Sequence, residues 1–397
     1  MKTKKKAPII RIKGFDGDWE QRKLGEVCQI TMGQSPEGST YSDEPSTYIL
    51  VQGNADLKDG WVCPRVWTTQ KTKTAEIGDL IMSVRAPAGT MGKTAYNVVL
   101  GRGVAGIKGN EFIYQTLVKM DADRYWKKLA SGSTFESINS DAITNAEIKL
   151  PQNVEEQEKL GSYFSHLDAL ITLHQREIDR IVCLRKAMVE KMFPQNGADV
   201  PAVRFSRYKE PWRLCQFSEI FTERHIIDTI SDEYPQLAFT IEEGVIRPED
   251  KKTNKRDFLI IDKATKKYLQ TEYDDIIYNP ANVIYGAIHR NALGKGCVSP
   301  IYKIFYTDQD STFMECIVRH PNFIKEISRS MEGTVKKLRT LKPKAFLEMS
   351  AYIAPTIEEQ RQIGEYFRQM DRLIEIEKEE LEKIKHIKSA CLEKMFV

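Results

Sequence analysis

The stretch that decides the fold occurs twice: residues 154–194 read VEEQEKLGSYFSHLDALITLHQREIDRIVCLRKAMVEKMFP, and residues 357–397 read IEEQRQIGEYFRQMDRLIEIEKEELEKIKHIKSACLEKMFV. The two copies align without a gap at an offset of about 203 residues, and about 16 of about 41 positions are identical. The shared blocks are EEQ, the pattern GxYF and the final EKMF. Such a match indicates an internal duplication.

Both copies carry apolar residues alternately three and four positions apart, the pattern of a coiled-coil helix. At 1.5 Å per residue each helix would be roughly 55–60 Å long, and the simplest partner for one copy is the other. A buried bundle helix is the alternative, but the flanks QREIDR and EKEELEKIKHIK are too charged for it. Polar residues interrupt both seams at the same places, His174 matched by Glu377 and Arg185 by Lys388. The predicted seam residues are Leu160, Phe164, Leu167, Ile171, Ile178, Ile181, Met188, Ile363, Phe367, Met370, Ile374, Leu381, Ile384 and Cys391.

The duplication also extends ahead of each helix. PIIRI at residues 8–12 recurs as PAVRF at residues 201–205, and Trp19 recurs as Trp212. In between, short β-like runs such as GDLIMSVR and YDDIIYN are separated by turn residues, and a helical stretch follows near 111–129 and 313–330. This order predicts two α+β modules whose sequences have diverged while the helices stayed alike.

Composition sets broad limits on location and chemistry. With 397 residues the chain is long enough for two or three domains of roughly 150 residues. The start, MKTKKKAPII, lacks the apolar core of a signal peptide, and no run reaches the roughly 18 apolar residues of a membrane span, so we expect a cytoplasmic protein. Seven irregularly spaced cysteines without a CxxC pair argue against a structural zinc site. The net charge is only +3, so a nucleic-acid function would have to rest on local basic patches.

Three motifs resemble catalytic or nucleotide-binding signatures, and each is incomplete. Residues 88–94, AGTMGKT, have Pro87 where a phosphate-binding loop needs glycine, and the strand-like run AYNVVL follows. GRGVAG at residues 101–106 fits GxGxxG, but another glycine stands where the helix should be running. YNPAN at 278–282 lacks the second proline and the aromatic of a methyltransferase motif, which would stack on a flipped base. We therefore expect a chain without catalytic residues or metal site.

Binding chemistry remains. The run from Glu332 to Lys344 contains five basic residues and one acid, and residues 251–256 read KKTNKR. The first module offers Lys71, Lys73, Arg85, Lys93 and Arg102 among Gly, Ser and Thr. Such groups can neutralise phosphates, while Arg, Gln and Asn can pair with base edges, although basic loops are often merely solvated.

The duplicated helices, with EEQ, GxYF and EKMF, together with WEQRKLGEV at residues 19–27, resemble the specificity subunit of type I restriction–modification enzymes. The resemblance covers nearly the whole chain. It implies two target-recognition domains separated by an antiparallel coiled coil of the two repeats, with pseudo-two-fold symmetry. The implied segments are an entry segment at 1–18, target-recognition domain 1 at 19–150, repeat helix 1 at 151–195, target-recognition domain 2 with its entry segment at 196–350, and repeat helix 2 at 351–397.

The resemblance also implies a function. Each domain would read one half of a bipartite, asymmetric site in double-stranded DNA, and the helices would set the gap between the halves. The chain itself would be non-catalytic and hold no cofactor. It would recruit two modification subunits, which use S-adenosylmethionine to methylate adenine, and two restriction subunits, which use ATP and magnesium to translocate and cut. The polar helix flanks and the EKMF ends are the expected docking sites.

Candidate DNA contacts follow from polarity, loop context and repeat position. In the first module they are Gln34, Ser35, Thr40, Tyr41, Arg85, Lys93, Ser133 and Thr134. In the second they are Arg256, Asn279, Asn282, His289, Arg290, Lys336, Lys337 and Arg339. Two other hypotheses stay open: a protein-binding coiled-coil scaffold, favoured by the near-neutral modules, and a self-sufficient nuclease or methyltransferase, disfavoured by the incomplete motifs.

Overall fold

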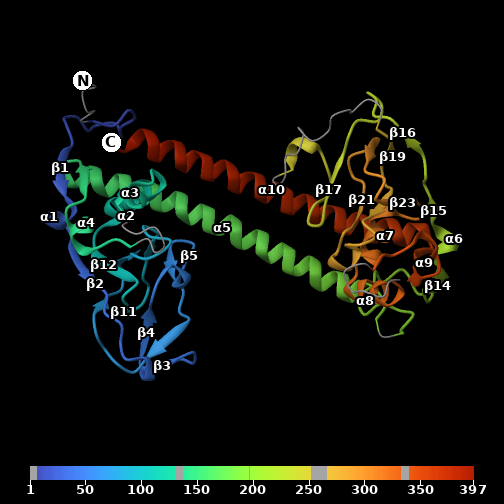
Figure 1. Ribbon diagram of the computed structural model, residues 1–397, viewed down its shortest axis with the longest axis horizontal. Helices are drawn as coiled ribbons and strands as arrows, with labels where there is room; N and C mark the ends of the chain where they lie inside the picture. The colour runs from blue at the N-terminus through green and yellow to red at the C-terminus, as the bar shows by residue number, and fades with distance from the viewer. Residues whose placement is uncertain (1–6, 130–136, 196, 252–265, 332–338) are drawn as a thin grey trace. The chain divides into compact units, whose positions relative to one another are not determined.

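The computed structural model describes residues 7–129, 137–195, 197–251, 266–331 and 339–397. Two long helices dominate it, α5 (Val154–Met192) and α10 (Ile357–Met395), each of 39 residues, as the duplicated heptads predict (Figure 1). The chain forms two compact units: unit 1 contains Met1–Glu177 and Glu377–Val397, and unit 2 contains Ile178–Ile376. Each unit therefore combines one module with half of each long helix. The segment boundaries expected from the sequence stay a prediction.

Within each unit the two helix halves run antiparallel. In unit 1, Tyr163 Oη lies 3.5 Å from Cys391 Sγ, and His174 Nδ1 lies 2.7 Å from Glu377 Oε2. Moving forward along α5 thus means moving backward along α10, which is the antiparallel direction. The pairing also explains the polar interruptions of the seam, because His174 faces its own repeat counterpart, Glu377.

The second polar interruption is satisfied in the same way in both units. In unit 1 the ammonium of Lys388 lies 2.5 Å from Asp168 Oδ1. In unit 2 Arg185, at the equivalent repeat position, binds Asp371 through two hydrogen bonds of 2.5 and 3.0 Å. A charged group at a helix–helix contact is tolerated when its partner is built in, and it favours one register over others.

The predicted seam residues lie on the inner sides of the helices to differing degrees. The fully buried ones gain roughly 1.5–3 kcal/mol each from leaving water. These are Leu160, Phe164, Ile178, Ile363, Phe367, Met370, Ile374 and Leu381. The remaining ones are half-buried: Leu167, Ile171, Ile181, Met188, Ile384 and Cys391.

The first module contains two sheets. One has the order β2-β12-β9-β10-β6-β5 and the other β3-β7-β4-β11-β8. Apolar residues of both sheets, including Val51, Ile81 and Leu100, form a shared buried core. The strands are β2 Gln29–Met32, β3 Tyr41–Ser42, β4 Tyr48–Val51, β5 Leu57–Lys58, β6 Trp61–Val62, β7 Val66–Thr68, β8 Thr74–Ala75, β9 Leu80–Ser83, β10 Met91–Lys93, β11 Val98–Leu100 and β12 Val104–Lys108. The helices are α1 Leu24–Val27, α2 Glu111–Ala122, α3 Tyr125–Leu129 and α4 Ser140–Thr144.

The second module has a four-stranded sheet of order β15-β23-β20-β21, a three-stranded sheet β16-β19-β22 and the hairpin β17-β18. Its strands are β15 Thr222–Glu223, β16 Ile227–Asp228, β17 Ala238–Thr240, β18 Gly244–Ile246, β19 Tyr268–Thr271, β20 Ile276–Tyr278, β21 Ile288–Arg290, β22 Gly296–Val298 and β23 Lys303–Tyr306. Its helices are α6 Phe217–Ile220, α7 Ser311–Val318, α8 Pro321–Ser330 and α9 Pro343–Leu347.

The two modules share a sheet plan that their sequences barely reveal. The order β2-β12-β9-β10 of the first corresponds to β15-β23-β20-β21 of the second, and every neighbouring pair in both is antiparallel. Each module also has a two-stranded ribbon beside its long helices: β1 (Glu20–Lys23) with β13 (Glu147–Leu150), and β14 (Arg213–Gln216) with β24 (Ser350–Ile353). The duplication therefore includes the modules as well as the helices, which establishes the α+β, two-module fold.

The phenylalanine of EKMF completes the core of the module in its own unit. Phe396, at the end of α10, stacks on Phe112 at 5.1 Å and lies 6.2 Å from the ring of Trp19. Phe193, at the end of α5, lies 5.7 Å from Trp212 in unit 2. The expectation that the whole EKMF end is a docking surface is therefore wrong for its Met and Phe, which are buried. Only Glu and Lys of each EKMF are exposed.

A buried ion pair joins each entry segment to its long helix. Arg11 binds both carboxylate oxygens of Glu156 at 2.7 and 2.8 Å, and Arg204 binds Glu359 at the same two distances. The residue before each arginine adds a backbone hydrogen bond of 2.9 Å to the lysine carbonyl of EKMF. Ile10 donates to Lys394, and Val203 donates to Lys191. The second glutamate of EEQ is thus the anchor of the entry segment.

The remaining residues of the repeated motif fit the helix against the module. The Gln157 side-chain oxygen accepts a hydrogen bond from Asn110, the N-cap of α2, and Gln360 accepts one from the backbone N–H of Asp310, the N-cap of α7. A Cβ on Gly161 would lie 2.9 Å from Glu111 Cβ, and one on Gly364 would lie 2.1 Å from Asp310 Oδ1. Only glycine permits this close approach, so EEQ and GxYF together define the junction.

Candidate nucleic-acid interface

One end of the shared sheet gathers the exposed polar residues of the first module. Met32 pairs with Ala105, and Ser83 pairs with Val104, so β2 and β9 end where β12 begins. The backbone N–H of Val84 donates 2.9 Å to the Gly103 carbonyl. This register brings three loops to one edge, and we call them the sheet-end loops of the first module. Their exposed side chains are Gln34, Arg85 and Arg102.

A further loop is tied to this edge by hydrogen bonds. Thr72 Oγ1 donates 2.6 Å to the Gln34 carbonyl, and the backbone N–H of Leu100 donates 2.7 Å to the carbonyl of Lys73. The Ser35 hydroxyl accepts from the backbone N–H of Arg102 at 3.1 Å. Lys71 and Lys73 are exposed here. Lys71, Lys73 and Arg102 are among the bases that the sequence already offers for phosphates, and the sheet register brings their loops beside Gln34.

Three candidates of the first module have structural roles in this loop region. Ser35 holds the Arg102 backbone, as described above. Thr40 Oγ1 donates 2.7 Å to the Glu37 carbonyl and lies 2.9 Å from the Thr68 hydroxyl. The Tyr41 hydroxyl donates 3.3 Å to the carbonyl of Pro36. These side chains shape the 34–41 loop.

Lys93 does not point to the sheet end. Its ammonium lies 2.9 Å from Glu111 Oε2, and over the rings of Trp61 and Tyr114 at 5.0 and 4.6 Å. Burial, helped by the nearby carboxylates of Asp168 and Glu111, raises the pKa of Tyr114. The choice of Lys93 as a DNA contact is corrected: strand pairing places it at the other end of β10, where it joins that strand to α2.

The second module presents the corresponding edge with different residues. Tyr278, the last residue of β20, pairs with both Lys303 and Ile288. The next residue, Asn279, accepts hydrogen bonds through Oδ1 from the backbone N–H groups of Ala281 and Asn282, at 3.0 and 3.2 Å. Asn279 and Asn282 are half-buried turn residues at this edge.

Corresponding segments lie beside the two edges. In the first module the backbone N–H of Ile138 donates 2.9 Å to the Val84 carbonyl, and in the second that of Leu341 donates 3.0 Å to the Pro280 carbonyl. Arg85 forms a β-bridge with Ser137. The candidates Ser133, Thr134, Arg256, Lys336 and Lys337 lie outside the described residues, and Arg339 is exposed.

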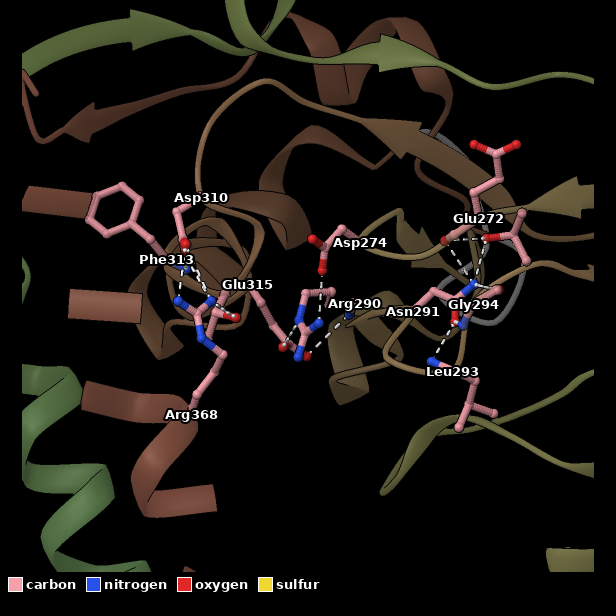
Figure 2. A network of polar contacts seen from close by, with 12 residues as sticks. Glu272, Asp274, Arg290, Asn291, Leu293, Gly294, Asp310, Phe313, Glu315 and Arg368 are labelled. Atoms are coloured by element: carbon pink, nitrogen blue, oxygen red, sulfur yellow. Dashed lines mark hydrogen bonds and ion pairs between the residues drawn. The ribbon is translucent and has the colours of Figure 1, made fainter. Parts of the chain in front are cut away.

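His289 and Arg290 are corrected by their burial. His289 is 4% exposed, its Nε2 lies 2.8 Å from the Ile241 carbonyl, and burial lowers its pKa to about 4. Figure 2 shows Arg290 held between Asp274, at 2.9 Å, and Glu315, at 3.6 Å. His289 is thus buried, and the half-buried Arg290 is bound to two acids. Polarity suggested them. In the structure β21 is an edge strand, and its polar side chains are occupied by the Ile241 carbonyl and by Asp274 and Glu315.

The catalytic look-alike motifs have ordinary structural roles. AGTMGKT runs through the β9–β10 hairpin, and GRGVAG forms the turn between β11 and β12, so no helix follows either glycine-rich loop. Within the described ranges, no group of three or more His, Cys, Asp or Glu side chains could hold a metal ion. No helix in that part of the chain is long and apolar enough to cross a membrane.

Comparison with known proteins identifies relatives along the whole chain. Residues 16–182 match the family model of the type I restriction modification DNA specificity domain. A Methanocaldococcus jannaschii protein that carries the name type I restriction enzyme MjaX specificity subunit is 30% identical over 182 residues, which span 43% of this chain and 42% of that relative. The MjaVIII specificity subunit from the same organism is 21% identical over 413 residues, covering 94% of this chain and 91% of its own.

A solved structure has the same fold. The S subunit of a type I restriction-modification system from M. genitalium matches with a TM-score of 0.67 at 16% identity, over 98% of this chain and 99% of that one. The match to the domain model falls on the first module and its helix, and the longer matches take in both duplicated halves. The chain is therefore similar over most of its length to type I restriction–modification specificity subunits, and residues 16–182 match their DNA specificity domain.

Proposed function

We propose that the chain is the DNA-recognition subunit of a type I restriction–modification complex, and that each module reads one half of a bipartite site. The observation that carries this proposal is the contrast between a duplicated junction and divergent sheet ends. Glu156 and Glu359 anchor their entry segments identically, whereas the sheet ends carry Gln34 and Arg85 in one module and Asn279 and Asn282 in the other. A repeated scaffold that presents unlike polar loops suits two unlike DNA sequences.

The long helices would set the gap between the two half-sites. Each is a continuous helix of 39 residues, and a helix is stiff enough to act as a spacer. The ion pair Lys388–Asp168 and its counterpart Arg185–Asp371 oppose sliding of one helix along the other. The gap in the recognised DNA sequence would then follow from helix register rather than from loop residues.

Exposed apolar residues on the long helices support docking of two copies of a partner. Three occur at equivalent positions of the two repeats, so that unit 1 and unit 2 each carry the same set. The exposed side chains are Leu170, Leu173 and Ile387 in unit 1, and Leu373, Ile376 and Leu184 in unit 2. Apolar side chains kept exposed in both copies fit a protein interface better than a solvated helix face. We assign these residues to the two modification subunits.

In this proposal the chain contributes recognition and no chemistry. Methyl transfer from S-adenosylmethionine would belong to the two modification subunits. Translocation and cleavage, with ATP and magnesium, would belong to two restriction subunits. The incomplete catalytic motifs of this chain agree with a role in recognition alone. We expect the complex to be cytoplasmic.

Sequencing of N6-methyladenine in the source genome, with and without this gene, tests the proposal. Deletion should abolish methylation at one split motif and leave other motifs unchanged. The gene restored with Leu170→Asp and Leu373→Asp together should fail to restore methylation, because each partner interface would carry a buried charge. An unchanged methylome would contradict the proposal. A wild-type chain that captures its partner while the complex shows no sequence preference for DNA would favour the protein-binding scaffold.

A further inference from the structure

We propose that Lys71, Lys73 and Arg102 form a phosphate clamp at the sheet end of the first module, which grips the DNA backbone beside the half-site that this module reads. The inference rests on the proposed function and adds the residues that bind DNA irrespective of its sequence. The Lys71–Lys73 loop and the Arg102 turn both contact the 34–35 segment through hydrogen bonds. Two loops that carry three exposed cations thus meet at one short stretch of backbone.

The clamp is rigid because its loops touch backbone to backbone. A Cβ on Gly33 would lie 2.0 Å from the Gly101 carbonyl oxygen, and a Cβ on Gly103 would lie 2.0 Å from that of Gln52. No side chain fits between these segments. The backbone N–H of Gln34 also donates 2.8 Å to the Leu100 carbonyl. The glycines of the GRGVAG motif therefore hold Arg102 at the tip of a fixed turn.

The charges of the clamp are available for a ligand. Among the described residues, no carboxylate forms an ion pair with Lys71, Lys73 or Arg102, and all three side chains are exposed. Other bases of the module are paired, including Lys93 with Glu111 and Lys108 with Glu76. Glu37 is an exposed acid of the neighbouring loop. Glu76, also exposed, is bound to Lys108, which lowers the pKa of Glu76 with a smaller contribution from the charge of Lys71. A fixed group of unpaired cations suits the evenly charged backbone of DNA.

Among the described residues, the second module presents a different set of side chains at the corresponding edge. Arg224 follows β15 as Gly33 follows β2. The backbone N–H of Arg224 donates to the Ile304 carbonyl, and that of Gly33 donates to the Val104 carbonyl. The Arg224 side chain turns inward to Asp275, at 2.9 Å. The turn before β23 carries Ile301, which is 58% exposed. Lys267 precedes β19 as Lys73 precedes β8, but its ammonium lies 3.9 Å from Asp228, whereas no ion pair of Lys73 with a described carboxylate occurs.

The test measures how salt affects DNA binding by the purified complex of this chain with its modification subunits. Probes are a duplex with the motif found by methylome sequencing and a scrambled duplex. Arg102→Ala should lower the slope of log K against log salt by about 0.9, and Lys71→Ala with Lys73→Ala by about 1.8. Each lost contact should reduce the difference in affinity between 50 and 200 mM salt by about threefold to fourfold, equally for both probes.

Two control variants separate charge from structure. Arg102→Lys keeps the cation and should retain the slope. Lys58→Ala, on β5 at the far edge of the sheet, removes one exposed cation and should also leave the slope unchanged. Unchanged slopes in the clamp variants, with motif-specific binding intact, would overturn the clamp alone. Relaxed preference at a single base in Arg102→Ala would overturn it in favour of base reading. If the wild-type complex bound the motif duplex and the scrambled duplex equally well, the proposed function itself would be overturned.

Discussion

The two sheet ends differ far more than the two junctions. In the first module the edge carries Lys71, Lys73 and Arg102, whereas the second carries Asn279 at a turn and the exposed Ile301. At the junctions, by contrast, each arginine–glutamate pair, helix cap and EKMF phenylalanine recurs in the same place. The difference shows that the contacts between long helix and module are kept in both copies, whereas the residues at the sheet ends are free to differ.

The largest effects should come from the EKMF phenylalanines. Replacing Phe193 or Phe396 with alanine removes a fully packed ring and should cost about 3–5 kcal/mol of stability. Because each ring packs in one unit, hydrogen exchange should accelerate in the second module for Phe193→Ala and in the first for Phe396→Ala. The opposite assignment, or equal effects in both modules, would contradict the packing. The exposed neighbour Glu190→Ala is the matched control.

The anchoring ion pairs should show a graded difference. Glu359→Ala strands Arg204, which is 8% exposed, and should cost about 3–5 kcal/mol. Glu156→Ala strands Arg11, which is 17% exposed, and should cost less because water can reach the guanidinium. Glu359 also accepts from the Trp212 ring N–H at 3.3 Å. Urea denaturation of both variants checks the order, and equal losses would show that exposure does not govern the cost.

Acid should destabilise the second module more than the first. The folded-state pKa of His289 is lowered to about 4 by burial, so the unfolded chain binds this proton more readily. The stabilising effect is complete above about pH 6.5 and is lost as the pH falls from there toward 4. The first module has Gly92 at the matching strand position, paired with Ile81 as His289 pairs with Ile277.

The measurement is hydrogen exchange in each module between pH 7 and 4.5. His289→Gln should reduce the acid response of the second module, after correction for any uniform loss of stability. Part of the response should remain, because burial also lowers the pKa of His320 in this module. Glu315, Glu242 and Arg319 lie near His289, and they partly offset one another. Similar acid responses in both modules of the unmodified chain would contradict the assignment to His289.

The smallest effect should come from converting one sheet end toward the other. Ile301→Lys places a cation at the turn before β23, the place that Arg102 occupies before β12 in the first module. The salt slope of DNA binding should rise by about 0.9 if that turn approaches a phosphate. Ile301→Gln is the neutral control. A slope that stays constant would mean that the second module keeps this turn away from DNA.

The candidate sites show where sequence reasoning is weak. Gln34, Arg85 and Arg102 lie apart in the chain and meet only because three antiparallel strands share one register. Lys93 and Arg290 read as exposed bases, yet the structure pairs them with Glu111 and Glu315. A charge pattern along one dimension does not show which acid will lie opposite a base.

The sequence by itself determined the duplication, the two long helices and the places where their seam turns polar. Helical period and repeat identity are local, so residues 154–194 and 357–397 carry them in full. Only the tertiary structure decided that Phe396 closes the core of the first module and Phe193 that of the second. It also decided which polar loops share a sheet end. Contacts between residues far apart in the chain depend on strand register and packing, and those follow from the whole fold rather than from any one stretch.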